Sequence, residues 1–249
     1  TGEQVLSQTD DNSYYKIYDN TYWWDINAWD AINLGRAYDS SRTFMEQLVS
    51  LLRDVPHMAL ARYNKNIINS DYTVDSFDVK NCYIAATIAL AENISYGLWV
   101  ISSRDSMDLL KTDHVERCYE IIDSSRCHNS QYIQNSTNCS DSYFLFDCHN
   151  CQNCFGGVNL RNKKYYFFNE QLSAEDYKAR IGAINLGSRS VRDEYLEKFN
   201  NLLRSKAILR ATYSKNSPGS LGDHIIDCRN CFWTFNAVSM KWALTFYKN

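Results

Sequence analysis

The sequence predicts a mainly β protein: a β-solenoid, or β-helix-like fold, on a repeat of about twelve residues, with an N-terminal helical cap and a helical insertion. Three observations support this prediction. A small residue followed by a large apolar or aromatic one recurs between about residues 69 and 169. Tyr occurs 18 times and Pro only twice, which favours strands with exposed or stacked rings. Helical patterns lie on both sides of the repeat. A short fixed period means that each repeat buries its apolar face only by stacking on its neighbours.

The repeat consists of a Cys or Ser followed by a ring or a Met. Its pairs are Cys82-Tyr83, Ser95-Tyr96, Ser106-Met107, Cys118-Tyr119, Ser142-Tyr143 and Cys154-Phe155. Ser130 lies midway between Cys118 and Ser142 and keeps the same register. Cys and Ser are small enough to line a narrow interior, while a ring one place later points to the opposite face and can stack as a ladder. A polar residue such as Asn81 usually precedes the pair, and Asn suits a corner. Whether one coil holds one repeat or two, and its handedness, stay open.

Four segments follow from this pattern. Residues 1–62 form an aromatic and helical cap, in which Thr43 and Glu46 make a capping box and Pro56 ends the helix. Residues 63–170 carry the solenoid repeats. Residues 171–215 form the helical insertion, with Ser173 as an N-cap and a second helix from about Ser190. Residues 216–249 resume the repeat at Cys228-Arg229-Asn230-Cys231-Phe232, and we expect the last coils to be missing or supplied by another copy.

Composition narrows the function classes. A formal net charge of −3 argues against a general electrostatic grip on nucleic acid. No apolar run approaches the length of a membrane span and no signal peptide is visible, so we expect no membrane association. The chain has nine cysteines, and because this number is odd and no signal peptide is visible we expect them to be reduced thiols. The expected location is intracellular (cytoplasmic), or within an intracellularly assembled particle.

The run from Ser142 to Lys163, with Cys148, Cys151 and Cys154 followed by Phe155-Gly156, resembles a Cys/Tyr-rich repeat protein family of metagenomic bacteria and phages. The resemblance extends over most of the chain, through Trp23-Trp24-Asp25, Trp29-Asp30, Ser41-Arg42-x-Phe44-x-Glu46-Gln47 and the insertion after Asn169-Glu170-Gln171. Family members usually carry an N-terminal zinc ribbon whose last cysteine pair precedes the double tryptophan. Asp19 and Tyr22 stand at those places here, so the ribbon is absent or degenerate. The resemblance implies the fold and supplies no activity.

The sharpest chemical motif is Cys148-x-x-Cys151-x-x-Cys154 with Cys228-x-x-Cys231, because paired thiolates at this spacing can turn onto one zinc ion. The alternative, which we favour, is that these cysteines are the small residues of successive repeats. No cofactor is then expected, with zinc as the alternative. The isolated Cys82, Cys118, Cys127 and Cys139 fit an interior ladder. His128 and His149 lie near cysteines and are further candidate ligands.

Other candidate sites have a structural alternative as well. Arg161, Lys163 and Lys164 beside Tyr165 and Tyr166 are the best nucleic-acid candidates, since cations among aromatics suit single strands; a solvated edge that discourages strand pairing is the alternative we favour. A carbohydrate-active β-helix enzyme would need converging carboxylates. The repeat offers Asp105, Asp108, Asp123, Asp141 and Asp147, which fit solvated corners better. We read Trp23, Trp24 and Trp29 as a packed cap.

No nucleophile elbow or P-loop is present. The sequence therefore favours a non-catalytic β-solenoid binding or structural scaffold module, self-assembling or part of a larger particle, and leans against an enzyme. Protein, whether self or other, is the expected partner. A nucleic-acid-associated protein and a carbohydrate-active β-helix enzyme are the alternative hypotheses.

Overall fold

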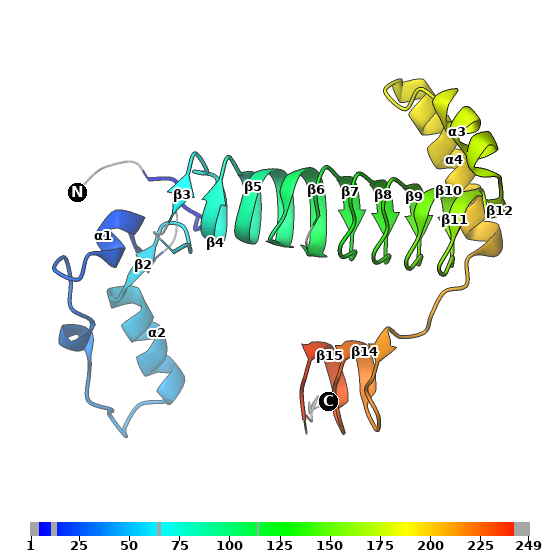
Figure 1. Ribbon diagram of the computed structural model, residues 1–249. Coiled ribbons are helices and arrows are strands. Elements are labelled where there is room, and N and C mark those ends of the chain that lie inside the picture. Colours follow the sequence, from blue (N-terminus) through cyan, green and yellow to red (C-terminus); the bar gives the residue numbers. More distant parts are fainter. Residues whose placement is uncertain (1–4, 11–13, 64–65, 114, 242–249) are drawn as a thin grey trace. The chain divides into compact units, whose positions relative to one another are not determined.

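The protein is mainly β, and the computed structural model describes residues 5–10, 14–63, 66–113 and 115–241. It divides into two compact units, Thr1–Lys206 and Ala207–Asn249. The first unit contains a ten-stranded sheet in the order β12-β11-β10-β9-β8-β7-β6-β5-β4-β3. Every neighbouring pair in it is parallel except β11 and β12. Figure 1 shows these strands stacked side by side in chain order. The strands are β3 (Ile67–Ile68), β4 (Thr73–Lys80), β5 (Tyr83–Ile101), β6 (Arg104–Asp113), β7 (Tyr119–Ile122), β8 (Gln131–Gln134), β9 (Tyr143–Phe146), β10 (Gln152–Val158), β11 (Lys164–Phe167) and β12 (Glu170–Gln171).

The register of the sheet is twelve residues, so each residue lies beside the one twelve places further along the chain, as Leu109 lies beside Ile121 and then Ile133. We call each such stretch of twelve residues a repeat. Neighbouring strands therefore belong to consecutive repeats. It also corrects the register at one place. Ile94, and not Ser95, pairs with Ser106 and is buried, so Ser95 and Tyr96 point outward. An Ile fills this interior position, so the pattern of small residues does not mark it.

Within each repeat the backbone follows a rhythm of three residues. Every third residue is buried, and the residue before it usually has a positive φ near 50°. This left-handed conformation costs an L-residue about 1–2 kcal/mol and is least unfavourable for Asn and Asp. The sequence accordingly places Asn or Asp at many of these corners, where they bond to their counterparts one repeat on. Such bonds join Asn69 to Asn81, Asn81 to Asn93, Asn129 to Asp141, Asn138 to Asn150 and Asn150 to Asn162.

The buried, inward-facing Ser and Cys side chains also form hydrogen bonds from one repeat to the next. The Ser136 hydroxyl donates to the Gln134 carbonyl at 2.8 Å and accepts from the Cys148 N–H at 2.9 Å. The Cys118 thiol likewise donates to the Glu116 carbonyl at 3.2 Å, and its sulfur accepts from the Ser130 N–H. Each side chain therefore satisfies an inward-facing N–H of the next repeat, which a buried backbone requires. Aliphatic residues fill the remaining interior positions; among the most buried are Ile88, Ile94, Ile121, Ile133 and Leu145.

The N-terminal segment is built from short elements: β1 (Lys16–Tyr18), α1 (Asn20–Trp24), the 3-10 helix η1 (Ala31–Leu34), α2 (Phe44–Asp54) and β2 (Pro56–Met58). Helix α2 has the expected capping box between Thr43 and Glu46. The tryptophan indoles are anchored on backbone, as Trp23 Nε1 donates to the Pro56 carbonyl at 3.0 Å. Trp24 stacks on Tyr63, and the ring of Tyr63 meets Phe77 edge-on in the second repeat strand. The segment thus contacts the first repeats through aromatic rings.

Two helices follow the sheet, α3 (Ala174–Gly182) and α4 (Arg189–Lys206). Ser173 caps α3 by accepting from the Asp176 N–H at 3.0 Å, as the sequence indicates. Helix α3 lies against β11, where the buried Tyr177 meets Tyr165, and α4 lies against β9 and β10. Figure 1 shows both helices at the end of the strand stack that carries β10, β11 and β12.

The second unit holds a three-stranded parallel sheet of β13 (Ser214–Lys215), β14 (Leu221–Ile226) and β15 (Phe232–Val238). Its register is eleven residues between β13 and β14 and twelve between Ile225 and Ala237. Gly222 is required at the shift in this register, because a Cβ there would lie only 1.8 Å from the Thr234 carbonyl oxygen. The repeat pattern of the first unit therefore returns after the helices.

Candidate binding surface

Three neighbouring outward columns of the sheet are rich in apolar side chains. The first contains Tyr83, Met107, Tyr119, Tyr143 and Phe155; the second contains Ile84, Tyr96, Tyr132 and Phe144; the third contains Leu98, Leu110, Ile122 and Phe146. The twelve-residue register sets these columns side by side, because it keeps every residue in line with its counterpart. The chain therefore presents an apolar strip along the strand stack. Its polar interruptions are Ser95, Asp108, Glu120, Gln131 and Gln134.

The later part of this strip is covered by α4. Phe199 packs on Phe144 with ring centroids 5.9 Å apart, and Tyr195 meets Phe155 edge-on at 5.2 Å. Phe144 and Phe155 are both fully buried. We call the residues Tyr132, Phe144, Phe146 and Phe155 the covered apolar face.

The earlier part of the strip is exposed. We call the residues Tyr83, Ile84, Tyr96, Leu98, Met107 and Ile122, together with Trp99 in the next outward column, the open apolar face. Tyr96 is 48% exposed, Leu98 43% and Trp99 57%. Isolated apolar side chains on a surface are ordinary, but a contiguous patch marks an interaction site. Aromatic residues and Met are also the types enriched at protein interfaces.

A shallow hollow of about 470 Å³ lies at a break in the first column. Its lining includes Ser95, Met107 and Tyr119. Ser95 stands in the column between Tyr83 and Met107, so the row of large side chains loses one member there. The other side of the hollow is polar, with Asn93, Asp105 and Arg117 in its lining.

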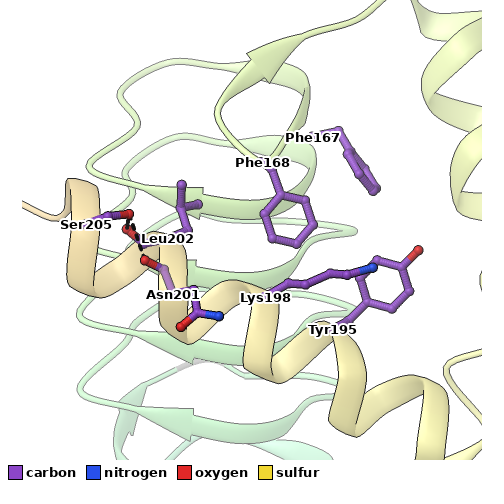
Figure 2. A pocket seen from close by; sticks show the side chains of 7 residues that line it. All are labelled: Phe167, Phe168, Tyr195, Lys198, Asn201, Leu202 and Ser205. Carbon is purple, nitrogen blue, oxygen red and sulfur yellow. Dashed lines mark hydrogen bonds between the residues drawn. The ribbon is translucent and has the colours of Figure 1, made fainter.

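A second hollow, of about 420 Å³, lies between α4 and the end of β11. Figure 2 shows Phe167 and Phe168 on the strand side, with Tyr195, Lys198, Asn201, Leu202 and Ser205 along the helix. The Lys198 chain extends toward the Tyr195 ring, with Nζ 4.7 Å from its centroid, and its ammonium pairs with Glu194 at 2.6 Å. The one cation of this lining is thus engaged within the helix.

The predicted nucleic-acid residues do not form one basic face. Arg161 donates to both the Asp147 carboxylate, at 2.7 Å, and the Leu160 carbonyl, at 2.9 Å. A left-handed corner at Asn162 separates it from the lysines. Lys163 lies over the Tyr166 ring at 5.4 Å and Lys164 over the Tyr165 ring at 5.1 Å. These cations therefore have partners within the chain.

Asp147 corrects the expectation that the carboxylates of the repeat are solvated corners. It occupies a corner with φ 47° but is only 2% exposed. Arg161 and Asn159 donate to its Oδ2, each at 2.7 Å, and the His149 ring lies 3.3 Å from its Oδ1. The His149 Nδ1 is 2.6 Å from the Thr137 hydroxyl. Burial follows from these partners: His149 is two residues away in sequence, while Asn159 and Arg161 come from the next repeat, twelve and fourteen residues away.

The other four aspartates do not converge with Asp147. Asp105 and Asp141 accept from Asn93 and Asn129 on one corner column, and Asp123 lies 3.8 Å from the Lys111 ammonium. Asp108 occupies a different corner column. Among the other carboxylates, Asp108 and Glu120 occupy the same outward column in neighbouring repeats.

The cysteines of the metal hypothesis all point inward. Cys148, Cys151 and Cys154 are buried in consecutive interior columns, and Cys228 and Cys231 are buried within the second unit. The thiols of Cys139, Cys148 and Cys154 hydrogen-bond to the Cys151 sulfur, which lowers the pKa of Cys151 and, together with burial, raises those of Cys148 and Cys154. Within the described ranges, no group of three or more His, Cys, Asp or Glu side chains is arranged to hold a metal ion.

The other ladder residues are placed as follows. Cys82, Cys118, Ser142 and Cys154 are buried, and Tyr83, Tyr119 and Tyr143 each lie one place further on and outward. Rings one repeat apart meet where the column is uninterrupted, as Tyr143 meets Phe155 at 6.0 Å. Cys127, Cys139 and Cys151 share one interior column in successive repeats.

None of the helices in the described part of the chain has both the length and the apolar character that crossing a bilayer requires. Comparison with known proteins adds no family: no protein-family model matches the sequence, and no curated protein matches it.

Sequence reasoning missed the division of the apolar strip into covered and open parts. One signal was present, because Phe144, Phe146 and Phe155 place Phe at outward positions where earlier repeats mostly carry Tyr, Leu or Ile. Phe is rarely selected for a solvated surface. Helix α4, with Tyr195 and Phe199 on one side, supplies the matching cover.

Proposed function

We propose that this chain is a β-solenoid binding or scaffold module without catalytic activity, and that its open apolar face binds another protein. One observation carries the proposal: the same outward columns are buried under α4 over the later repeats and exposed over the earlier ones. Because α4 covers the later part of these columns, we expect a partner protein to cover the exposed earlier part.

Three further features support a coiled, repeat-based scaffold. The parallel pairing at twelve residues, the corner bonds between successive Asn and Asp residues, and the interior bonds of Ser and Cys all recur from repeat to repeat. Such stacking makes a rigid, elongated surface, which repeat proteins commonly use for binding. Membership of the Cys/Tyr-rich repeat family is part of the same proposal and rests on the motifs quoted above.

A site-specific photo-crosslinker tests the binding role. In the cells that naturally make the protein, Leu98 is replaced by p-benzoylphenylalanine, and a control chain carries the same group at Glu116, an exposed residue on another side of the repeat. We expect protein adducts from position 98 and none from position 116. If position 98 gives no adduct, or gives adducts with nucleic acid only, the proposal is wrong.

A further inference from the structure

We infer that the open apolar face takes an amphipathic helix of a partner protein, with aromatic residues on its apolar side and a basic residue facing Asp108 and Glu120. This inference rests on the proposed binding function and names the kind of partner. It follows from how the chain covers the continuation of the same face with α4.

Helix α4 shows what fits the strip. Its side chains Tyr195 and Phe199 contact the first and second columns at Phe155 and Phe144. The contact is made by rings, packed edge-on or tilted, which is the favoured geometry for aromatic pairs. An α-helix is also a natural match for an apolar strip, because residues three and four apart project from one side.

The open face repeats the same positions. The register carries Phe155 through Tyr143 to Tyr119 and Met107, and carries Phe146 back to Ile122 and Leu98. The second column continues from Phe144 through Tyr132 to Tyr96, interrupted by Glu120 and Asp108. A partner helix would therefore meet large apolar side chains in the first and second columns, which α4 contacts at Phe155 and Phe144, and also in the third.

The second column carries acidic side chains beside the open apolar face and none within the covered apolar face. Asp108 and Glu120 stand in the second column, where the covered face has Tyr132 and Phe144. Glu120 accepts a hydrogen bond from the Tyr119 hydroxyl, which raises the pKa of Tyr119. The positive charge of Arg192, in α4, lowers the same pKa. Arg192 and Asp193 at the start of α4 both act on the pKa of Tyr132, so α4 brings no net charge to this end of the strip, and a cation of a partner helix would complement Asp108 and Glu120.

The hollow at Ser95 provides a specific contact. Its lining combines Met107 and Tyr119 with Asn93, Asp105 and Arg117, which suits an aromatic side chain that carries a polar group, such as Tyr or Trp. A ring placed there would restore the interrupted first column between Tyr83 and Met107. Aromatic anchors in such hollows commonly dominate the binding energy of an interface.

The probe for this inference is a synthetic peptide with the α4 sequence, residues 188–206, carrying p-benzoylphenylalanine in place of Phe199. It is added to the intact protein, and its binding is followed by fluorescence anisotropy and its crosslinks by mass spectrometry. We expect crosslinks to residues 83–122. We also expect at least tenfold weaker binding to the Leu98→Glu variant, and unchanged binding to a Ser140→Glu control on another side of the repeat.

Specificity is tested with a peptide in which Tyr195, Phe199 and Leu202 are Ser, which keeps the charge and should not bind. The inference is overturned if the peptide does not bind, if its crosslinks fall on the covered apolar face, or if the Leu98→Glu variant binds as the wild type does. Protein adducts from position 98 in cells without peptide binding would retain the binding face and remove the helix, so the two proposals fail separately.

Discussion

The Ser136→Ala substitution tests why the interior of the repeat is built from Ser and Cys. The hydroxyl is completely buried, donates to the Gln134 carbonyl and accepts from the Cys148 N–H. After truncation the Gln134 carbonyl still accepts from the Asp147 N–H at 3.0 Å, so it stays satisfied. The Cys148 N–H loses its acceptor. A buried donor without a partner costs about 1–3 kcal/mol, and we expect a loss of about 2 kcal/mol in the free energy of unfolding.

Urea unfolding followed by circular dichroism measures this loss. Ser140→Ala, at an outward position four residues further along the chain, is the matched control and should change the free energy by less than about 0.5 kcal/mol. Ser136→Cys should retain most of the stability, because the Cys118 sulfur makes the same two bonds. Equal effects of Ser136→Ala and Ser140→Ala would refute the proposed role of the interior hydroxyls.

Three further perturbations follow from the structure. Asp147→Ala should lower the free energy of unfolding by about 2 kcal/mol, less than for a fully buried pair because Arg161 is partly exposed, and no loss in a thermal melt would contradict its role. All nine cysteines are buried, and burial raises the pKa of Cys118 to about 12, so Ellman's reagent should label nine thiols in denaturant and almost none in the native protein; about one zinc per chain by elemental analysis would instead revive the metal hypothesis. The Tyr213 N–H donates to the Asp223 carboxylate at 2.7 Å and lowers the pKa of Asp223 below the ordinary 3.8. The ionised carboxylate therefore stabilises the folded protein above pH 3.8, and this stabilisation is lost as the pH falls further. Asp223→Asn should reduce the acid sensitivity of thermal unfolding, and an unchanged pH profile of the melting temperature would count against this.

Local patterns predicted local structure well. The capping box at Thr43 and the N-cap at Ser173 mark the helices where the structure has them, because caps depend on residues close in sequence. The Ser and Cys register was readable except at Ser95, where an interior Ile94 hides it. The burial of Asp147 and the covering of Phe144 by Phe199 were not predictable. Both depend on which repeats and helices meet in three dimensions, and a single sequence does not display such contacts.

The twelve-residue stacking underlies the open face, the interior bonds and the proposed partner. A pair of engineered disulfides tests it directly. Ser125→Cys with Thr137→Cys places two thiols on residues that pair across neighbouring strands. Strands lie about 4.8 Å apart, within the Cα separation that a disulfide accepts. Asp113→Cys with Thr137→Cys spans two strand spacings, about 9.6 Å, which is too far.

Oxidation of the two variants followed by peptide mapping gives the answer. With one repeat per coil, the pair twelve residues apart closes a disulfide and the pair twenty-four residues apart does not. The opposite result would mean that a coil holds two repeats, and the apolar columns described above would no longer lie side by side.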